Sequence, residues 1–571
     1  MNLRPLFLLL SLQPLNALDL PPGGIEVGVE MPLQASASPE VGKVESLETG
    51  KRITITEADP AKAFGAQFTA PIPSGLSRNE RVLALIKARV VGGGETGEVL
   101  AKLQLQGAPY TPLAASIGVG IHREWTDLPV VFVAEDAVPE AKAAVVLLCA
   151  HRAQTIEVES IRVLRYPEST PLTAFPKPKP IKRTYAGREP DAPWRKAALE
   201  RIEQHRKRDL SLIVEGGDGA PLPESEVKLV LRRHTFGFGS AVVAKRFSSD
   251  SEDDSRYREI VDRLFSLIVF ENDLKDGQWD PGLDAERKAG RNAELNAAFD
   301  WLAERRIGVR GHYLMQVATP YNLHGITDSA EIRNRILTSV HDRLDFVKDR
   351  VVEWDVINHP IAWGGADLLS KRPGLETLDR EVFAQSRSLT SLPFFVNEDQ
   401  VFRPGPQYDD TFAYIEKLNA DGFTVDGLGN QAHFHESYLP SPEHLLSVTD
   451  RFAKIVPRQS ITEYDVVTTE DEELAADFTR DVLIAVFSHP AYTSFLLWGF
   501  WEGSHWKPEA ASWGKNWSIL PRGEVLEEWI GRRWRTEVTL NTDASGKVSW
   551  RGFPGWYEIT AGGRTQLVKA E

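Results

Sequence analysis

Polar and ionisable side chains follow a series of short apolar runs in this sequence, and their types suit the binding of hydroxyl groups and the transfer of protons. Amides and lysine hydrogen-bond neighbouring hydroxyls, carboxylates and imidazoles move protons, and tryptophan faces stack on the apolar C–H faces of sugar rings. The set is Glu271, Asn272, Lys275, His312, Asn358, His359, Asn397, Glu398, Asp399, Gln431, His433, Glu463, Asp465, Trp498 and Trp506. A carbohydrate is the ligand that this combination fits best.

Patterns that indicate other chemistries are missing from the sequence. It has neither a close triad of histidines and carboxylates, which would indicate a metal site, nor a glycine-rich phosphate loop between a strand and a helix. Cys149 is the single cysteine, so an intramolecular disulfide and a thiolate metal site are excluded. We therefore expect no metal and no other cofactor.

Eight apolar runs, separated by amphipathic stretches, carry these polar residues. The runs span 236–243, 265–270, 309–314, 351–357, 393–396, 425–428, 461–467 and 495–500. Alternation of strands with helices predicts an α/β fold, a (β/α)8 TIM barrel over residues 234–533. The carboxyl ends of the strands meet at one face of such a barrel, which would bring the polar set together.

The rest of the chain predicts smaller parts around the barrel. Residues 1–17 have a charged start followed by an apolar run, which is typical of a signal peptide. Short β-rich runs over 20–168 predict an all-β sandwich. Residues 169–208 read as a proline-rich linker and then a helix from about 193 to 208. Two accessory β elements are expected, at 209–233 and 534–571, and they should pack together.

Composition narrows the class of protein further. The chain has 571 residues and a net charge of −15, which argues against a nucleic-acid partner. Apart from the short N-terminal run, no segment is long and apolar enough to predict a membrane span. The signal segment predicts a secreted or periplasmic protein. The polar and aromatic set described above predicts that its partner is a polysaccharide or oligosaccharide. The oligomeric state cannot be predicted from these features.

Six segments, in order along the chain, resemble motifs of glycoside hydrolase family 10, the endo-β-1,4-xylanases. The matching segments are Glu271-Asn272-Asp273-Leu274-Lys275 (ENxMK in the family), Arg310-Gly311-His312 (RGH), Trp354-Asp355-Val356-Ile357-Asn358 (WDVVN), Asp426 to His433 (DGIGxQxH), Ile461-Thr462-Glu463-Tyr464-Asp465 (ITELD) and Trp498-Gly499-Phe500 with Trp506 (WGF…W). The resemblance covers about 235–533. The 20–168 segment resembles a carbohydrate-binding module, though only loosely.

The resemblance implies a mechanism that retains the anomeric configuration, with a pair of carboxyl groups at the scissile bond. Glu463 would be the nucleophile, supported by His433 and Asp465, and Asn358 would hydrogen-bond the sugar 2-OH. The remaining residues implied to bind substrate are Glu271, Asn272, Lys275, His312, Gln431, Trp498 and Trp506.

Two departures from the family pattern stand beside these matches. Directly after Asn358 the family has its acid/base glutamate, and this chain has His359. At the third strand the family continues with Trp-His-Ser-Gln, where this chain has Gln316-Val317-Ala318-Thr319. The missing carboxyl matters because general acid catalysis contributes about 10²–10⁴-fold.

Three interpretations follow from the histidine. His359 itself donates the proton, or another carboxylate such as Glu398, Asp399 or Glu436 does so, or the site binds glycan without cleaving it. The sequence thus predicts a secreted glycosidase acting on β-1,4-xylan-type polysaccharide through a Glu463 glycosyl-enzyme intermediate, with an altered acid/base group. The alternative is a catalytically inactive glycan-binding protein.

Overall fold

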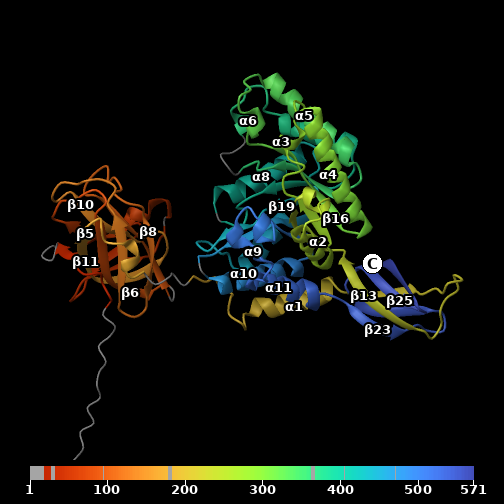
Figure 1. Ribbon diagram of the computed structural model, residues 1–571, viewed down its shortest axis with the longest axis horizontal. Helices are drawn as coiled ribbons and strands as arrows, with labels where there is room; N and C mark the ends of the chain where they lie inside the picture. The colour runs from red at the N-terminus through yellow and green to blue at the C-terminus, as the bar shows by residue number, and fades with distance from the viewer. Residues whose placement is uncertain are drawn as a thin grey trace, which may run out of the picture. The chain divides into compact units, whose positions relative to one another are not determined.

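The computed structural model describes residues 18–27, 32–58, 60–93, 96–177, 183–361, 367–403, 405–469 and 471–571. The chain divides into two units, Met1–Arg183 and Thr184–Glu571 (Figure 1). The expected signal peptide at 1–17 lies outside the described residues. Within the described part of the chain, no helix has the length and apolar character needed to cross a membrane.

Two antiparallel sheets make up the first unit. One contains β3 (Gly42–Ser46), β4 (Lys51–Ile55), β11 (Gln154–Tyr166), β6 (Arg81–Gly92) and β9 (Thr126–Val133), with β1 (Ile25–Val27) paired to β11. The other contains β2 (Gln34–Ala37), β5 (Ala66–Ile72), β10 (Ala143–Leu148), β7 (Thr96–Leu105) and β8 (Ile117–His122). Two short 3-10 turns, η1 (Pro60–Gly65) and η2 (Leu172–Ala174), complete the described elements.

Side chains that alternate along these strands build the core of the first unit. In β4, for example, Ile53 and Ile55 are buried while their neighbours are partly exposed, as the two-residue period of a strand dictates. Cys149 is free and fully buried in this core, and burial raises the pKa of its thiol. The antiparallel sheets are consistent with the predicted all-β domain.

The second unit is built on a closed barrel of eight parallel strands. The strands, in ring order, are β14 (Gly237–Val242), β15 (Leu267–Phe270), β16 (Gly308–Gln316), β17 (Glu353–Asn358), β18 (Phe394–Glu398), β19 (Gly427–Asn430), β21 (Arg458–Val467) and β22 (Tyr492–Leu497). Pairing of β22 with β14 and of β19 with β21 closes the ring. Each strand falls within or overlaps one of the eight apolar runs, so the predicted TIM barrel is confirmed. A short strand, β20 (His433–His435), pairs with the upper part of β21.

Helices cover the outside of the barrel. They are α2 (Glu252–Leu264), α3 (Asp276–Trp279), α4 (Ala285–Glu304), α5 (Ser329–Val347), α6 (Asp367–Ser370), α7 (Leu378–Leu389), α8 (Pro406–Ala420), α9 (Pro442–Phe452), α10 (Glu472–Ser488) and α11 (Pro521–Glu528). Short turns lie between them, namely η3 (Ala244–Phe247), η4 (Tyr321–Leu323), η5 (Glu502–Ser504), η6 (Pro508–Ala510) and the π turn η7 (Trp529–Arg533).

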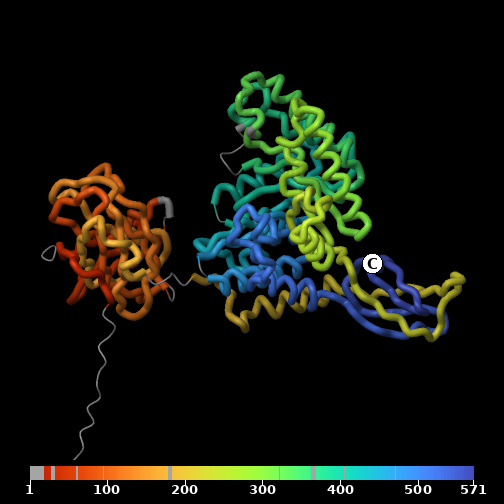
Figure 2. Tube along the Cα trace, in the orientation of Figure 1, coloured from red at the N-terminus to blue at the C-terminus, as the bar shows by residue number. Residues whose placement is uncertain are grey.

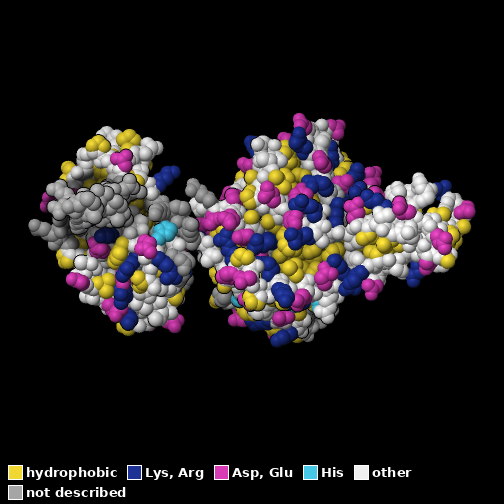
Figure 3. All heavy atoms as spheres, turned by 90° about the horizontal axis from the view of Figure 1, so that it is seen from below, with side chains coloured by type: hydrophobic (Ala, Val, Ile, Leu, Met, Phe, Trp, Pro, Cys, Tyr) yellow, Lys and Arg dark blue, Asp and Glu magenta, His cyan; other side chains and the backbone are white. Residues whose placement is uncertain are grey.

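Helix α2 illustrates how the sequence sets these elements. The Ser251 hydroxyl accepts the Asp254 N–H and caps the first turn, which also carries three acidic residues that favour the positive end of the helix dipole. Tyr257, Val261 and Leu264 recur at helical spacing and are buried against the barrel. On the surface, acidic and basic side chains are interspersed (Figure 3), and pairs such as Arg380 with Asp421 join them.

An additional helix and two small sheets flank the barrel. Helix α1 spans Pro193–His205, so the prediction that it reaches Arg208 was wrong: Arg208 already pairs with Gly552 as the first residue of β12 (Arg208–Ile213). Strand β12 pairs with β24 (Lys547–Gly552), and β13 (Glu226–His234) lies between β23 (Glu537–Asn541) and β25 (Gly555–Ala561), which also pairs with β26 (Arg564–Ala570). Figure 2 shows the 208–234 segment beside the C-terminal strands.

Candidate active site

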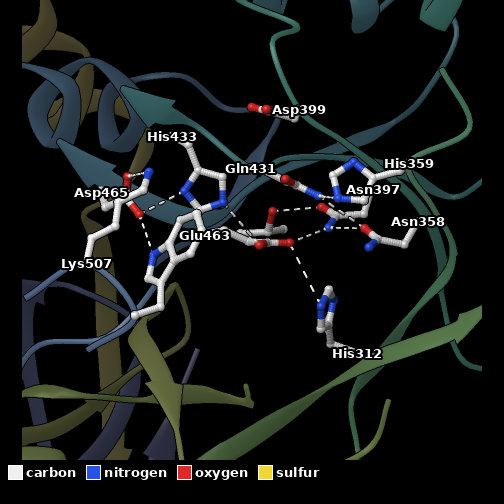
Figure 4. A network of polar contacts seen from close by, with 12 residues as sticks. His312, Asn358, His359, Asn397, Asp399, Gln431, His433, Glu463, Asp465 and Lys507 are labelled. Carbon is white, nitrogen blue, oxygen red and sulfur yellow. Dashed lines mark hydrogen bonds and ion pairs between the residues drawn. The ribbon is translucent and has the colours of Figure 1, made fainter. Parts of the chain in front are cut away.

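The residues singled out in the sequence lie at the carboxyl ends of the barrel strands. Asn358 ends β17, Asn397 lies near the end of β18, and Gln431 directly follows β19. Glu463 lies in β21, with His433 beside it at the start of β20. Their side chains form one polar network around the Glu463 carboxylate (Figure 4).

Glu463 is buried, yet it is surrounded by hydrogen-bond donors. Its Oε1 accepts from Asn397 Nδ2 at 2.7 Å, and its Oε2 lies 3.3 Å from His433 Nε2. Burial raises the pKa of this carboxyl, but the His433 hydrogen bond and the nearby His312 and Lys275 outweigh burial and lower the pKa to about 2. The carboxylate is therefore ionised at neutral pH, which is the state that a nucleophile requires.

His433 lies between two carboxylates and links them. Its Nδ1 is 2.9 Å from Asp465 Oδ2, and its other nitrogen faces Glu463. Burial lowers the pKa of His433, but Asp465 and Glu463 raise it by more than burial lowers it, so the pKa is about 10. The imidazole is thus a cation that donates to both carboxylates and fixes the direction of Glu463.

Asp465 is held from its other side by two residues of the loop after β22. Trp506 Nε1 donates to its Oδ2 at 2.8 Å, and Lys507 Nζ lies 3.4 Å from its Oδ1. Burial raises the pKa of Asp465, but His433, Lys507 and Trp506 lower it below its usual value. The Trp506 indole is 44% exposed and packs 4.9 Å from the His433 ring, so it lies at the open rim of the site.

A chain of side-chain amides runs from Glu463 to His359. Asn397 Nδ2 donates to Glu463 and also to Asn358 Oδ1, at 2.9 Å. Gln431 Nε2 lies 3.2 Å from the same Asn358 oxygen and 3.1 Å from His359 Nε2. Thr462 Oγ1 donates to Asn397 Oδ1 at 2.7 Å and so fixes the orientation of that amide.

On the other side of Glu463, residues that are expected to bind sugar lie around the Trp498 indole. The His312 ring lies 5.2 Å from this indole, and Lys275 Nζ lies 5.3 Å from its ring centre. His312 Nε2 is 4.0 Å from Glu463 Oε1. Glu271, beside the exposed Asn272, is half-buried, and burial raises its pKa. Burial lowers the pKa of Lys275, while Glu463 and Glu271 raise it in part.

A fully buried arginine is linked to His312 through Asp355. Arg310 forms ion pairs with Glu353 and Asp355, and Asp355 Oδ2 lies 3.0 Å from His312 Nδ1. This arrangement leaves His312 Nε2 facing the site. Arg310 is therefore a structural residue that positions a ring at the site.

His359 and the carboxylates proposed as proton donors lie in different surroundings. The His359 backbone adopts φ 53°, its N–H donates to Asn397 O, and its Nδ1 is 3.6 Å from Glu398 Oε1. Glu398 is fully buried, whereas Asp399 lines a pocket at the mouth of the barrel with His433. Glu436 is bound to the Thr469 N–H on a separate loop.

The departure at the third strand also has a structural consequence. Val317 is fully buried, its N–H donates to Asn358 O and its carbonyl accepts from Leu368. Val317 therefore packs in the interior and links β17 to α6, while Gln316, Ala318 and Thr319 are half-buried. The segment contributes neither an indole nor an imidazole to the wall of the site.

The structure brings all the expected site residues to one end of the barrel and adds others. From the sequence, Asn397 is only a polar residue at a predicted strand end, which predicts no particular role for it. Its position directly after an apolar run was the one available signal. Thr462 and Arg310 lie within matched motifs, and Lys507 follows the last one, but the role of each depends on partners far away in the sequence.

Comparisons with known proteins show what this chain is similar to. Residues 227–521 match the family model described as Glycosyl hydrolase family 10. Anti-sigma-I factor RsgI6 of Acetivibrio thermocellus is 29% identical over 371 residues, which are 64% of this chain and 46% of that protein. Endo-1,4-beta-xylanase 2 of Arabidopsis thaliana is 25% identical over 368 residues, 62% of this chain and 32% of that protein.

The chain thus spans less than half the length of these two curated relatives. Among solved structures, xylanase 10B from Thermotoga petrophila RKU-1 in complex with xylobiose is 22% identical, with a TM-score of 0.45. That alignment covers 52% of this chain and 95% of the xylanase.

Proposed function

Since the chain belongs to glycosyl hydrolase family 10, we propose that it cleaves a β-1,4-xylan-type polysaccharide with retention of anomeric configuration. The observation that carries the proposal is the state of Glu463, a buried carboxylate held ionised and aimed by Asn397 and His433 at the mouth of the barrel. The names of xylanase relatives support the choice of xylan.

In the first step, the Glu463 carboxylate attacks the anomeric carbon, and the glycosidic C–O bond breaks as a proton reaches the leaving oxygen. Asn358 Oδ1 is occupied by Asn397 and Gln431, so its Nδ2 is directed away from the network and can donate to the sugar 2-OH. In the second step, water attacks the same carbon, the bond to Glu463 breaks, and the acid/base group takes the proton from water.

The acid/base group in this proposal differs from that of the family pattern. His359 occupies the position after Asn358, so the proton comes from His359 or from another carboxylate nearby. A xylan leaving group is an alkoxide without that proton, and the acid is worth about 10²–10⁴-fold in rate.

A second candidate function is glycan binding without cleavage. The observation that favours it is the short contact between Gln431 Nε2 and His359 Nε2, which engages the one imidazole nitrogen that faces the network. In that case the cleft would keep its affinity for xylo-oligosaccharides and release no product.

Product release from xylan and from an aryl β-xylobioside separates the two functions. For a glycosidase, the full-length protein should release product from the aryl substrate with the β anomer formed first, and Glu463→Ala should abolish release. Glu416→Ala is the matched control, because Glu416 is an exposed carboxylate on α8. If a folded protein cleaves neither substrate but binds xylohexaose in calorimetry, the binding function replaces the enzymatic one.

A further inference from the structure

We propose that Asp399 is the acid/base residue that takes the place of the family glutamate. This inference rests on the proposed glycosidase function. It follows from three observations: the direction of the hydrogen bonds that reach His359, the enclosure of Glu398, and the position of Asp399 over the site.

The hydrogen-bond network fixes His359 as an acceptor. The Glu463 carboxylate can only accept, so the Asn397 amide must turn its N–H groups toward Glu463 and Asn358. Asn358 therefore presents its oxygen, and Gln431 must donate one N–H to that oxygen and the other to His359 Nε2. A nitrogen that accepts from Gln431 carries no proton, so His359 has none to give on this side.

Glu398 is also excluded by its contacts. It is fully buried, its Oε1 accepts the Asp399 N–H at 2.8 Å, and its Oε2 accepts the Ile361 N–H at 2.7 Å. Both oxygens are thus engaged by backbone N–H groups. The charge of Glu398 also raises the pKa of Tyr414 on α8. The Glu436 carboxylate accepts the backbone N–H of Thr469.

Asp399 differs from the other carboxylates in its position. It is the first residue after β18 and therefore lies at the mouth of the barrel, next to the strand end that carries Asn397. It lines a pocket of about 80 Å³ with Ala432, His433 and Tyr438. Its Oδ1 accepts the Gln400 N–H at 2.7 Å. Figure 4 shows the Asp399 carboxyl apart from the network that contains Glu463, without a contact to it.

The surroundings of Asp399 also change its pKa in the direction that suits an acid. Burial raises the pKa of Asp399, and Glu398 raises it further, while His433, His359 and the Gln400 N–H lower it only in part. The pKa of Glu463 is lowered, whereas that of Asp399 is raised. A nucleophile requires the first shift and an acid the second.

The reaction balances with this pair alone. Asp399 gives its proton to the glycosidic oxygen as that oxygen leaves, and Glu463 forms a bond to the anomeric carbon. Asp399, now a carboxylate, takes a proton from water as the water oxygen attacks the anomeric carbon and displaces Glu463. The acid is then protonated again and the nucleophile is free.

Asp399→Ala tests the assignment with two substrates and a small anion. We expect kcat/KM on xylan to fall about 10²–10⁴-fold, because the leaving group loses its proton donor. An aryl β-xylobioside with a low-pKa leaving group should lose far less in kcat/KM. Sodium azide should restore turnover of the aryl substrate and give the β-glycosyl azide, because azide attacks the intermediate without a base.

His359→Ala, Glu398→Gln and Glu436→Ala are assayed in parallel and should show no azide rescue. Glu416→Ala, at an exposed residue of α8, is the unaffected control. Cleavage of xylan by Asp399→Ala within about threefold of wild type would overturn the assignment, as would azide rescue of His359→Ala in its place. Failure of the proposed function itself looks different, because the wild-type protein would then cleave neither substrate.

Discussion

Replacing His433 by alanine should move the pH at which Glu463 ionises. The wild-type pKa is about 2, against an ordinary value of 4.5, and the hydrogen bond from His433 is the largest of the lowering causes. Burial remains in the variant and raises the pKa, so we expect the Glu463 pKa to reach or exceed 4.5. A shift of that size corresponds to about 3 kcal/mol at about 1.4 kcal/mol per pKa unit.

The assay is the pH dependence of kcat/KM on an aryl β-xylobioside, whose leaving group needs little protonation. The acid limb should move from below pH 3 in wild type to above pH 4 in His433→Ala. Carbon NMR of the Glu463 carboxyl gives the same pKa in a protein without activity. His435→Ala is the matched control, because His435 is an exposed residue of the same short strand and bonds to Ser437. An unchanged Glu463 pKa in His433→Ala would refute the reasoning.

Three further predictions follow from the same contacts. Because the pKa of His433 is raised, its protonation stabilises the fold fully below the ordinary pKa of 6.5, and this contribution is lost as pH rises toward 10. The free energy of unfolding in urea should therefore fall between pH 6.5 and 10 by on the order of 5 kcal/mol more in wild type than in His433→Ala. Gln431→Glu removes the donor to His359 Nε2 and offers an acceptor, so nitrogen NMR should show a proton on that nitrogen; an unprotonated Nε2 would contradict the network polarity. Arg310→Met leaves Glu353 and Asp355 as buried charges without their partner and should cost about 3–5 kcal/mol of stability, whereas Arg532→Met, in an exposed pair, should leave the urea midpoint unchanged.

The barrel could be predicted because its strands are buried and read as continuous apolar runs. Val269 and Phe270 of β15, for instance, are both buried, and such a run between amphipathic stretches is typical of a parallel sheet with helices outside it. The end of α1 could not be predicted, because residues 206–208 suit a helix as well as a strand. Pairing of Arg208 with Gly552, a distant residue, decides the outcome.

The site was predictable as a set of residues but not as a network. Glu463 and His433 lie in motifs with a recognisable order, whereas the contact between Asn397 and Glu463 joins residues 66 positions apart. The direction of each amide depends on which neighbour can only accept, and that information appears only when the side chains are placed together. The same limit applies to Glu398 and Asp399, which are adjacent in sequence: Glu398 binds two backbone N–H groups, whereas Asp399 lines a pocket with His433.

The histidine at position 359 does not by itself remove the chemistry of a retaining glycosidase. Such an enzyme needs one carboxyl that is ionised and another that is protonated, and it needs both to face the scissile bond. Here the ionisation of Glu463 depends on His433, His312 and Lys275, none of which contacts the position after Asn358. Burial is the largest cause that raises the pKa of Asp399, and His359 lowers that pKa only in part. Neither effect needs a carboxyl at position 359, so the proton donor can come from the loop after the fifth strand while the nucleophile keeps its place on the seventh.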